Sequence, residues 1–219
     1  MKLYTYVVAR DYGFAPNPFF GLCTLATCKP RIREGAQVGD WVAGTGSKKH
    51  GLGDHLVYAM RVGETLTFDE YWANPRFRSK RPNLRGSLKQ AFGDNIYHRD
   101  PSSGLWRQEK SHHSHGNGQT NSANVKNDTQ TNRVLVSDWF VYFGRDAVEI
   151  PARFRQGKEE TVTRHGRNHL VNFRPGFEEE FIAWVLSLGQ KGFRGEPIAF
   201  RRQLAKTGTG IRKQVRRSA

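Results

Sequence analysis

The chain has 219 residues, of which 37% are hydrophobic and 25% are charged, and it contains 14 Phe, 7 Tyr and 5 Trp. This length suits one ordinary domain, and the aromatic content excludes a disordered or collagen-like chain because it can bury a core. No stretch approaches the roughly 20 apolar residues of a membrane span. With two cysteines and no apolar signal-peptide region, we expect a cytoplasmic protein with reduced thiols and no membrane partner.

The charge is strongly positive, because 35 Lys and Arg face 20 Asp and Glu and give a net charge of +15. Such a field attracts polyanions, above all nucleic acid. Residues 201–219 hold seven basic residues and no acid, and we expect them to form a basic C-terminal tail. Residues 76–89 hold six basic residues and no acid around Phe77. Basic residues interleaved with an aromatic suit a surface that follows a nucleic-acid backbone and stacks a base.

Alternating and β-branched residues in the first half of the chain predict four strands, at 3–9, 22–28, 41–43 and 56–62. Ile32 and Ala36 share a face at helical spacing, which predicts a short helix over residues 30–37. Thr67 and Glu70 have the spacing of a capping box, in which each side chain bonds the other's backbone N–H. We therefore expect a short helix after Thr67 that ends before Pro75.

The second half begins with a long polar insertion, residues 99–133, which is rich in Ser, Asn, Gly, His and Thr. Residues 134–143 are the strongest strand of the chain, and residues 147–150 are expected to pair with them. Phe177, Phe181 and Val185 recur at helical spacing and predict an amphipathic helix that packs on the domain. Residues 1–200 thus read as a single α+β domain.

The cysteines and histidines of this sequence form no distinctive metal-binding or nucleophile motif. Cys23 and Cys28 lack the second close pair of a structural zinc site and are interpreted as buried small hydrophobes. Three histidines of the insertion are interpreted as solvated loop residues: His112, His113 and His115. We expect no metal and no cofactor. The catalytic residues are unknown, with Asp138 and His98 as the first to test.

Several basic residues are candidates for phosphate contact. Lys48 and Lys49 follow a Gly-rich turn whose amides form either an anion-binding nest or a plain turn. Arg164 and Arg167 flank a pair of histidines and suit phosphate better than zinc. The predicted backbone contacts of the middle cluster are Arg76, Arg78, Lys80 and Arg81.

Aromatic residues are the most promising candidates for base binding. In a small barrel half of them face the core, while the mouth of the barrel is a natural pocket for a flat heterocycle. The predicted pocket residues are Trp41, Tyr58, Trp139 and Phe14, with hydrogen bonds from Thr45 and Ser47.

Six segments taken together carry a family resemblance: residues 3–9, 24–30, 38–46, 56–62, 68–72 and 136–144. With them the chain resembles the second class of nucleotide-modification-associated domains of bacteria and phages over most of residues 1–200. A second and looser resemblance is to the PUA-like superfamily, with its EVE, YTH and ASCH members. It rests on the order of Val38-Gly39-Asp40, a strand, a glycine and a second strand. This resemblance implies a PUA-like small mixed β-barrel with peripheral helices and a mouth pocket for a flipped, often modified base.

Three functional hypotheses follow. The first is a binding module that recognises a modified base in DNA. It would be linked to bacterial or phage DNA modification and to phage defence. The second is an enzyme that makes or edits a modified base or nucleotide, with residues 99–133 as a lid. The third is an RNA-binding PUA-like domain, which the basic charge allows equally well. The modification and the oligomeric state stay open, because fold alone rarely determines function.

Overall fold

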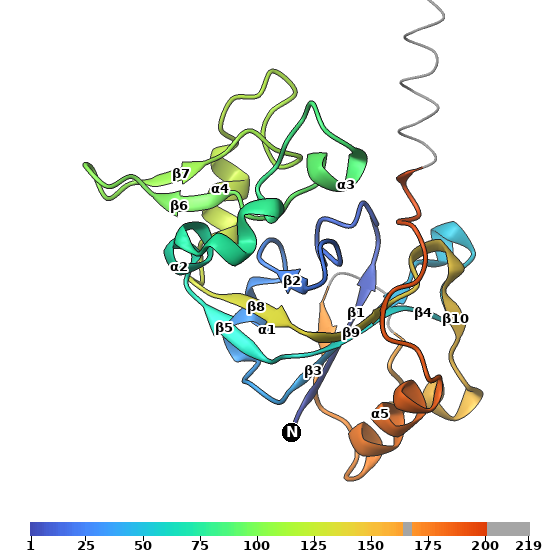
Figure 1. The fold of residues 1–219 in the computed structure, drawn as a ribbon. Helices are drawn as coiled ribbons and strands as arrows, with labels where there is room; N and C mark the ends of the chain where they lie inside the picture. The colour runs from blue at the N-terminus through green and yellow to red at the C-terminus, as the bar shows by residue number, and fades with distance from the viewer. Residues whose placement is uncertain (164–167, 201–219) are drawn as a thin grey trace, which may run out of the picture.

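The computed structural model describes residues 1–163 and 168–200, and its largest sheet crosses the middle of the molecule (Figure 1). Its strands are β1 (Leu3–Val8), β3 (Trp41–Gly46), β4 (His55–Arg61), β9 (Trp139–Tyr142), β10 (Val148–Glu149), β11 (His169–Leu170) and β12 (Gly192–Phe193). They lie in the order β11-β1-β3-β4-β9-β12, and β10 pairs with β4. β1 and β3 are parallel, whereas β4 is antiparallel to both β3 and β9.

Two smaller sheets lie beside the large one. The first contains β2 (Cys23–Leu25), β8 (Val134–Ser137) and β5 (Glu64–Leu66), in that order and with antiparallel pairing. The second is the antiparallel pair β6 (Tyr97–Arg99) and β7 (Trp106–Gln108). The α+β class predicted from the sequence is therefore confirmed.

The helices are short. The α-helices are α1 (Pro30–Gly35), α2 (Phe68–Ala73), α3 (Leu88–Ala91), α4 (Ser122–Asp128) and α5 (Phe177–Ser187). The 3-10 helices are η1 (Lys48–His50), η2 (Pro75–Lys80), η3 (Gly144–Asp146) and η4 (Ala152–Phe154). The capping box of α2 is confirmed, since the Thr67 N–H donates to Glu70 at 2.7 Å and the Glu70 N–H donates to the Thr67 hydroxyl at 3.2 Å.

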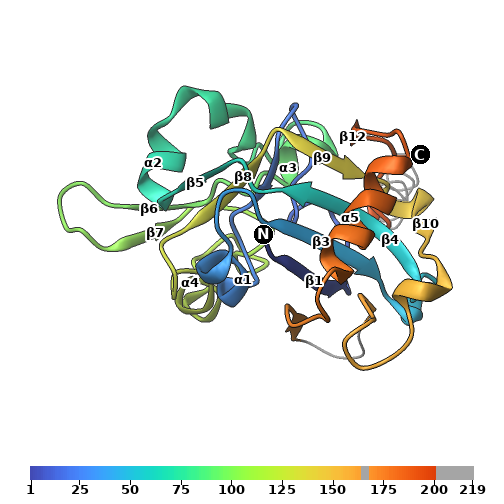
Figure 2. The ribbon, with the colours of Figure 1, turned by 90° about the horizontal axis from the view of Figure 1, so that it is seen from below.

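The large sheet is buried on both faces, and its side chains alternate between two cores as the strand period of two requires. Trp41 and Ala43 of β3 pack into the core under α5, which crosses β3 and β4 in Figure 2. Val42 of β3 and Tyr58 of β4 pack into the core on the other face, together with α1. Successive residues of one strand thus belong to different cores.

The described strands do not close into a barrel, because β11 and β12 stand at opposite ends of an open sheet. The predicted strand 134–143 is also divided. β8 ends at Ser137 and belongs to the small sheet, while β9 begins at Trp139 and belongs to the large one. At the change of sheet the Ser137 hydroxyl donates to the Trp139 carbonyl, and Asp138 between them is exposed.

The polar insertion, residues 99–133, has regular structure and packs on the rest of the domain. It contributes β7 and α4, which lie with β6 and α2 at the end of the molecule away from α5 (Figures 1 and 2). The core beneath this end contains Phe68 and Tyr71 of α2 together with Phe92 and Tyr97. No helix among residues 1–163 and 168–200 is long and apolar enough to cross a membrane.

Candidate nucleic-acid interface

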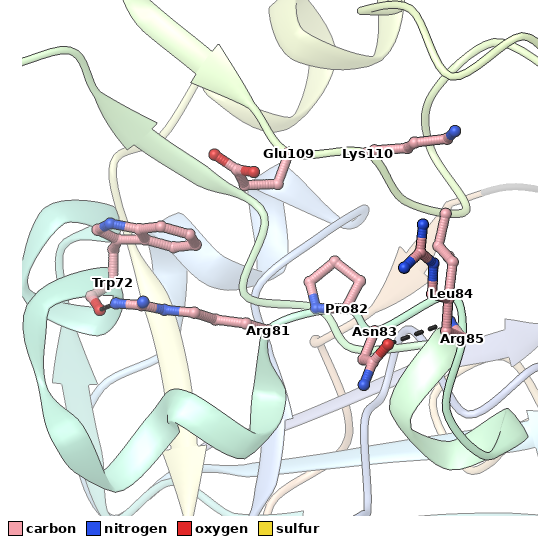
Figure 3. A pocket seen from close by; sticks show the side chains of 8 residues that line it. All are labelled: Trp72, Arg81, Pro82, Asn83, Leu84, Arg85, Glu109 and Lys110. Atoms are coloured by element: carbon pink, nitrogen blue, oxygen red, sulfur yellow. Dashed lines mark hydrogen bonds between the residues drawn. The ribbon is translucent and has the colours of Figure 1, made fainter.

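A cleft with an aromatic wall lies where α2 and the segment after η2 meet the end of β7. Its volume is about 510 Å³, and it is lined by Trp72, Arg81, Pro82, Asn83, Leu84, Arg85, Glu109 and Lys110. Figure 3 shows Trp72 and Arg81 on one side and Leu84 and Arg85 on the other, with Glu109 and Lys110 along the upper edge. This volume falls within the range of ligand sites, about 300–1,000 Å³.

The aromatic wall is held rigid by its neighbours. The Arg81 guanidinium carbon lies 3.7 Å from the centroid of the Trp72 ring, and Arg81 also donates a hydrogen bond to the Trp72 carbonyl. The His98 ring stacks on Trp72 with centroids 4.2 Å apart and planes 13° apart. His98 Nε2 lies 2.9 Å from Glu109 Oε1, so that Glu109 already has a partner.

The cleft carries an excess of positive charge. Arg85 and Lys110 are exposed, and neither makes an ion pair with another residue in the described part of the chain. With Arg81 they place three cations against the single carboxylate of Glu109. Cations beside flat π surfaces suit a phosphate-bearing base. Because the Trp72 ring already stacks on His98 and contacts Arg81, a base would stack on the Arg81 plane and not directly on Trp72.

The residues predicted to wall a base pocket lie in the two cores instead. Trp41 is 4% exposed and packs edge-on against the half-buried Trp139, with ring centroids 4.8 Å apart. Tyr58 is fully buried on the opposite face of the sheet, where its hydroxyl donates to Tyr6 at 2.9 Å. Because they face opposite sides of β3 and β4, Trp41 and Tyr58 do not meet in one pocket.

The remaining predicted base contacts are engaged with the protein. Thr45 is fully buried, and its hydroxyl donates to the Tyr6 carbonyl at 3.4 Å. Ser47 caps η1 by accepting from the Lys49 N–H at 3.3 Å. Phe14 is 4% exposed, and its ring lies 4.6 Å from that of His113.

The middle basic cluster divides into buried, paired and exposed members. Lys80 is 1% exposed, and its ammonium donates to three oxygens: Asn17 O, Asn17 Oδ1 and Leu22 O, at 2.7–2.8 Å. Arg76 forms an ion pair with Glu64 at 2.9 Å, and Arg78 is exposed. Of this cluster's four predicted phosphate contacts, only Arg81 lines the cleft.

The other predicted site residues are scattered. Lys48 and Lys49 are exposed on η1. Asp138 lines a second, smaller cavity of about 190 Å³, whereas His98 stacks on the wall of the large cleft. Arg164, Arg167 and the tail 201–219 lie outside the described residues.

Sequence reasoning missed Trp72, Glu109 and Lys110 as site residues. Trp72 had a usable signal, since the capping box places it near the end of α2, just before the basic cluster. Lys110 had no such signal in the sequence, because only the folding of the insertion brings the residues after β7 to the cleft.

Comparison with known proteins places the chain in a family. The family model for nucleotide modification associated domain 2 matches residues 1–204. The chain belongs to this family. Neither the curated proteins nor the solved structures contain a match. The family's description associates the chain with nucleotide modification, and the cleft lies within the matched residues.

Proposed function

We propose that this protein binds DNA in nucleotide modification and that the Trp72 cleft receives a base together with its phosphate. The observation that supports this most is that Arg81, Arg85 and Lys110 all line one cavity of about 510 Å³, with Arg81 against the Trp72 ring. The net charge of +15 adds a long-range attraction for any polyanion.

The two kinds of contact have different consequences for binding. Stacking on an aromatic or guanidinium plane contributes about 1–3 kcal/mol per base and tolerates any sequence. Phosphate contacts by Arg85 and Lys110 release counterions, and this part of the affinity falls as salt rises. Selectivity for a modified base therefore depends on the cleft wall, while the cations set the overall affinity.

Recognition of a modified base is the finer part of the proposal. The cavity is larger than one flat ring fills, and its wall includes the polar groups of Asn83 and Glu109. The Asn83 side-chain oxygen accepts the Arg85 N–H at 3.1 Å, which orients the amide beside the cleft. A relation to PUA-like base readers is a further prediction, which rests on the sequence pattern alone.

The test is fluorescence anisotropy with single-stranded and duplex DNA at two salt concentrations. Arg85→Gln with Lys110→Gln removes two cleft cations without breaking an ion pair, and we expect binding to weaken about tenfold and the salt slope to fall by about 2. Lys2→Gln with Lys126→Gln removes the same charge from two exposed positions outside the cleft and is the matched control.

Two outcomes would contradict the proposal. If the cleft pair and the control pair weaken DNA binding equally, binding depends on the total positive charge of the protein and not on the cleft. A preference of the wild-type protein for RNA of the same sequence would favour the RNA-binding alternative. Probes with plain, methylated, hydroxymethylated and glucosylated bases test selectivity in the same assay. The pair Lys48→Gln with Lys49→Gln tests the predicted phosphate contacts of these two lysines.

A further inference from the structure

Three side chains far apart in the sequence meet at the loop that follows β7. Cys28 Sγ lies 3.7 Å from His113 Nε2, and His113 Nδ1 lies 2.8 Å from Asp128 Oδ2. The order is thiol, imidazole and carboxylate, each within hydrogen-bonding distance of the next. The sequence reading of Cys28 as a buried hydrophobe and of His113 as a solvated loop residue is wrong, since Cys28 is half-buried and His113 is tied to both partners.

The carboxylate is fixed by more than the histidine. Asp128 is fully buried at the end of α4, and its Oδ1 accepts the Cys28 N–H at 2.8 Å. The Tyr97 hydroxyl donates to Oδ2 at 3.0 Å. The buried Arg33 donates to the carbonyls of both Cys28 and Asp128 and so joins the two ends of the group.

The imidazole is positioned by its backbone and by a ring. The His113 carbonyl accepts from the side-chain amides of Gln108 and Asn124, at 3.3 and 2.8 Å. Phe14 packs against its ring with centroids 4.6 Å apart. A histidine with only 15% of its side chain exposed and with both nitrogens engaged is held in one orientation.

The backbone at the thiol is strained. Cys28 has φ 57° and the next residue, Lys29, has φ 43°, so that two consecutive residues with side chains adopt the left-handed region. This conformation is uncommon for residues other than glycine, and it persists where the surroundings enforce it, often at functional sites. Here the Asp128 and Arg33 hydrogen bonds hold the backbone in this conformation, and Cys28 as a residue is only half-buried.

We propose that Cys28 is the nucleophile of an acyl-transfer reaction, that His113 is its general base and acid, and that Asp128 is the positioning residue that orients His113. The substrate class is an ester or amide carbonyl carried by nucleic acid, and the nucleic-acid part of this class rests on the proposed function. The order nucleophile, base and orienting carboxylate is the one that acyl-transfer sites share across unrelated folds.

The pKa of His113 sets the pH range in which it can act as a base. Burial opposes a positive charge on His113, but the hydrogen bonds to Asp128 and Cys28 outweigh it and raise the pKa of His113 to about 9. Burial likewise opposes charge on Asp128, yet its bonds to His113 hold the pKa of that carboxyl below its usual value. At neutral pH His113 is therefore mostly protonated, and the fraction that can act as a base rises as the pH approaches 9.

The reaction balances without an oxidant or a reductant. In molecules whose His113 is neutral, this imidazole takes the thiol proton, the sulfur electron pair forms a bond to the carbonyl carbon, and the C=O π pair moves to the oxygen. When that pair returns, the bond to the leaving amine or alcohol breaks, and His113 delivers the proton to it. Water then adds to the thioester with His113 as base, which releases the acid and restores the Cys28 thiol.

The test uses the full chain and the small ester p-nitrophenyl acetate, with no nucleic acid. We expect one equivalent of p-nitrophenolate in a fast burst and one acetyl group on Cys28 by peptide mass spectrometry. Cys23 is an internal control, because it is fully buried and burial raises the pKa of its thiol to about 12. It should remain unmodified in the folded protein.

Variants separate the three roles. Cys28→Ser should abolish the burst, and His113→Gln should slow it by about a hundredfold or more. His115→Gln is the matched control, because His115 is exposed on the same loop and lies outside the cluster. Asp128→Asn should slow acylation and move its pH dependence to lower pH, since a neutral amide no longer stabilises the imidazolium. A loss of packing alone would not move the pH dependence.

Two results would overturn the proposal. One is acylation of Cys28 that is equally fast in the wild-type protein and in a folded His113→Gln variant. The other, which needs no variant, is a native Cys28 that reacts no faster with the ester than the same thiol does in the urea-unfolded chain. Because neither measurement involves the Trp72 cleft, failure here leaves the DNA-binding proposal standing. Failure of DNA binding would remove only the nucleic-acid part of the substrate class.

Discussion

Arg33 gives the sharpest stability prediction, because a guanidinium with no exposed surface ties three segments together. It donates to the carbonyls of Cys28 at 2.9 Å, Thr131 at 3.2 Å and Arg133 at 2.7 Å, and to that of Asp128. Burial lowers the pKa of Arg33 to about 10, so the side chain is still protonated at neutral pH.

The perturbation is Arg33→Met, which keeps the length of the side chain and removes its charge and donors. Hydrogen bonds to a charged group contribute about 1.5–3 kcal/mol each, and four carbonyls would lose theirs. The lost desolvation cost of the guanidinium offsets part of this, because burying a charge is itself unfavourable. We therefore expect the free energy of unfolding to fall by about 3–5 kcal/mol.

The assay is urea unfolding followed by circular dichroism. With a slope of about 2 kcal/mol per molar urea, the expected loss lowers the midpoint by about 2 M. Arg31→Met is the matched control, since Arg31 is exposed on the same helix, and its effect should stay within about 0.5 kcal/mol. A loss below about 1 kcal/mol for Arg33→Met would refute the reasoning that these carbonyls depend on it.

Two further predictions concern pH and packing. The pKa of His113 is raised to about 9, above its unfolded value of about 6.5, so its contribution to stability is full below pH 6.5 and is lost as pH rises through 9. The groups that face it or lie close by are Asp128, Cys28, His112, Tyr97 and Arg33. Unfolding free energies measured between pH 6 and 9.5 should fall by up to about 3 kcal/mol more in the wild-type protein than in His113→Gln, and identical slopes would argue against the ion pair. Gly93→Ala should cost about 1–3 kcal/mol in thermal unfolding, because its Cβ would meet the Lys80 carbonyl oxygen at 2.3 Å and the Arg81 and Pro82 backbone at 2.8 Å. Gly116→Ala, where nothing lies within 4 Å, is the control, and an equal effect at both positions would contradict the packing argument.

Local signals predicted the elements that local chemistry determines. The Thr67–Glu70 capping box begins α2 as expected, and the spacing of Phe177 and Phe181 predicts α5. Residues 3–9 and 56–62 correspond to β1 and β4 within a residue or two. The cap of α2 and the apolar face of α5 come from residues near one another in the sequence. The strands β1 and β4 were found from local runs of strand-favouring residues, although their hydrogen bonds go to distant strands.

The sequence did not predict the features that depend on a partner far away in the chain. Residues 134–143 read as one strand because each residue suits a strand, and the change of sheet at Asp138 depends on partners that lie elsewhere in the chain. The two-residue strands β11 and β12 are too short to carry a pattern, and they exist through pairing with β1 and β9.

The sequence by itself determined that this is a basic α+β chain, that it resembles a nucleotide-modification family, and where its principal strands and helices lie. Tertiary structure alone decided which of its many cations line the cleft. Lys80 is enclosed by three oxygens while its neighbour Arg81 stacks on Trp72 at the cleft, although the two read alike in sequence. It also decided that Cys28 meets His113 and Asp128, which follow it by 85 and 100 residues. The physical reason is that burial and partnership depend on the whole chain, whereas charge, periodicity and capping depend on a few neighbouring residues.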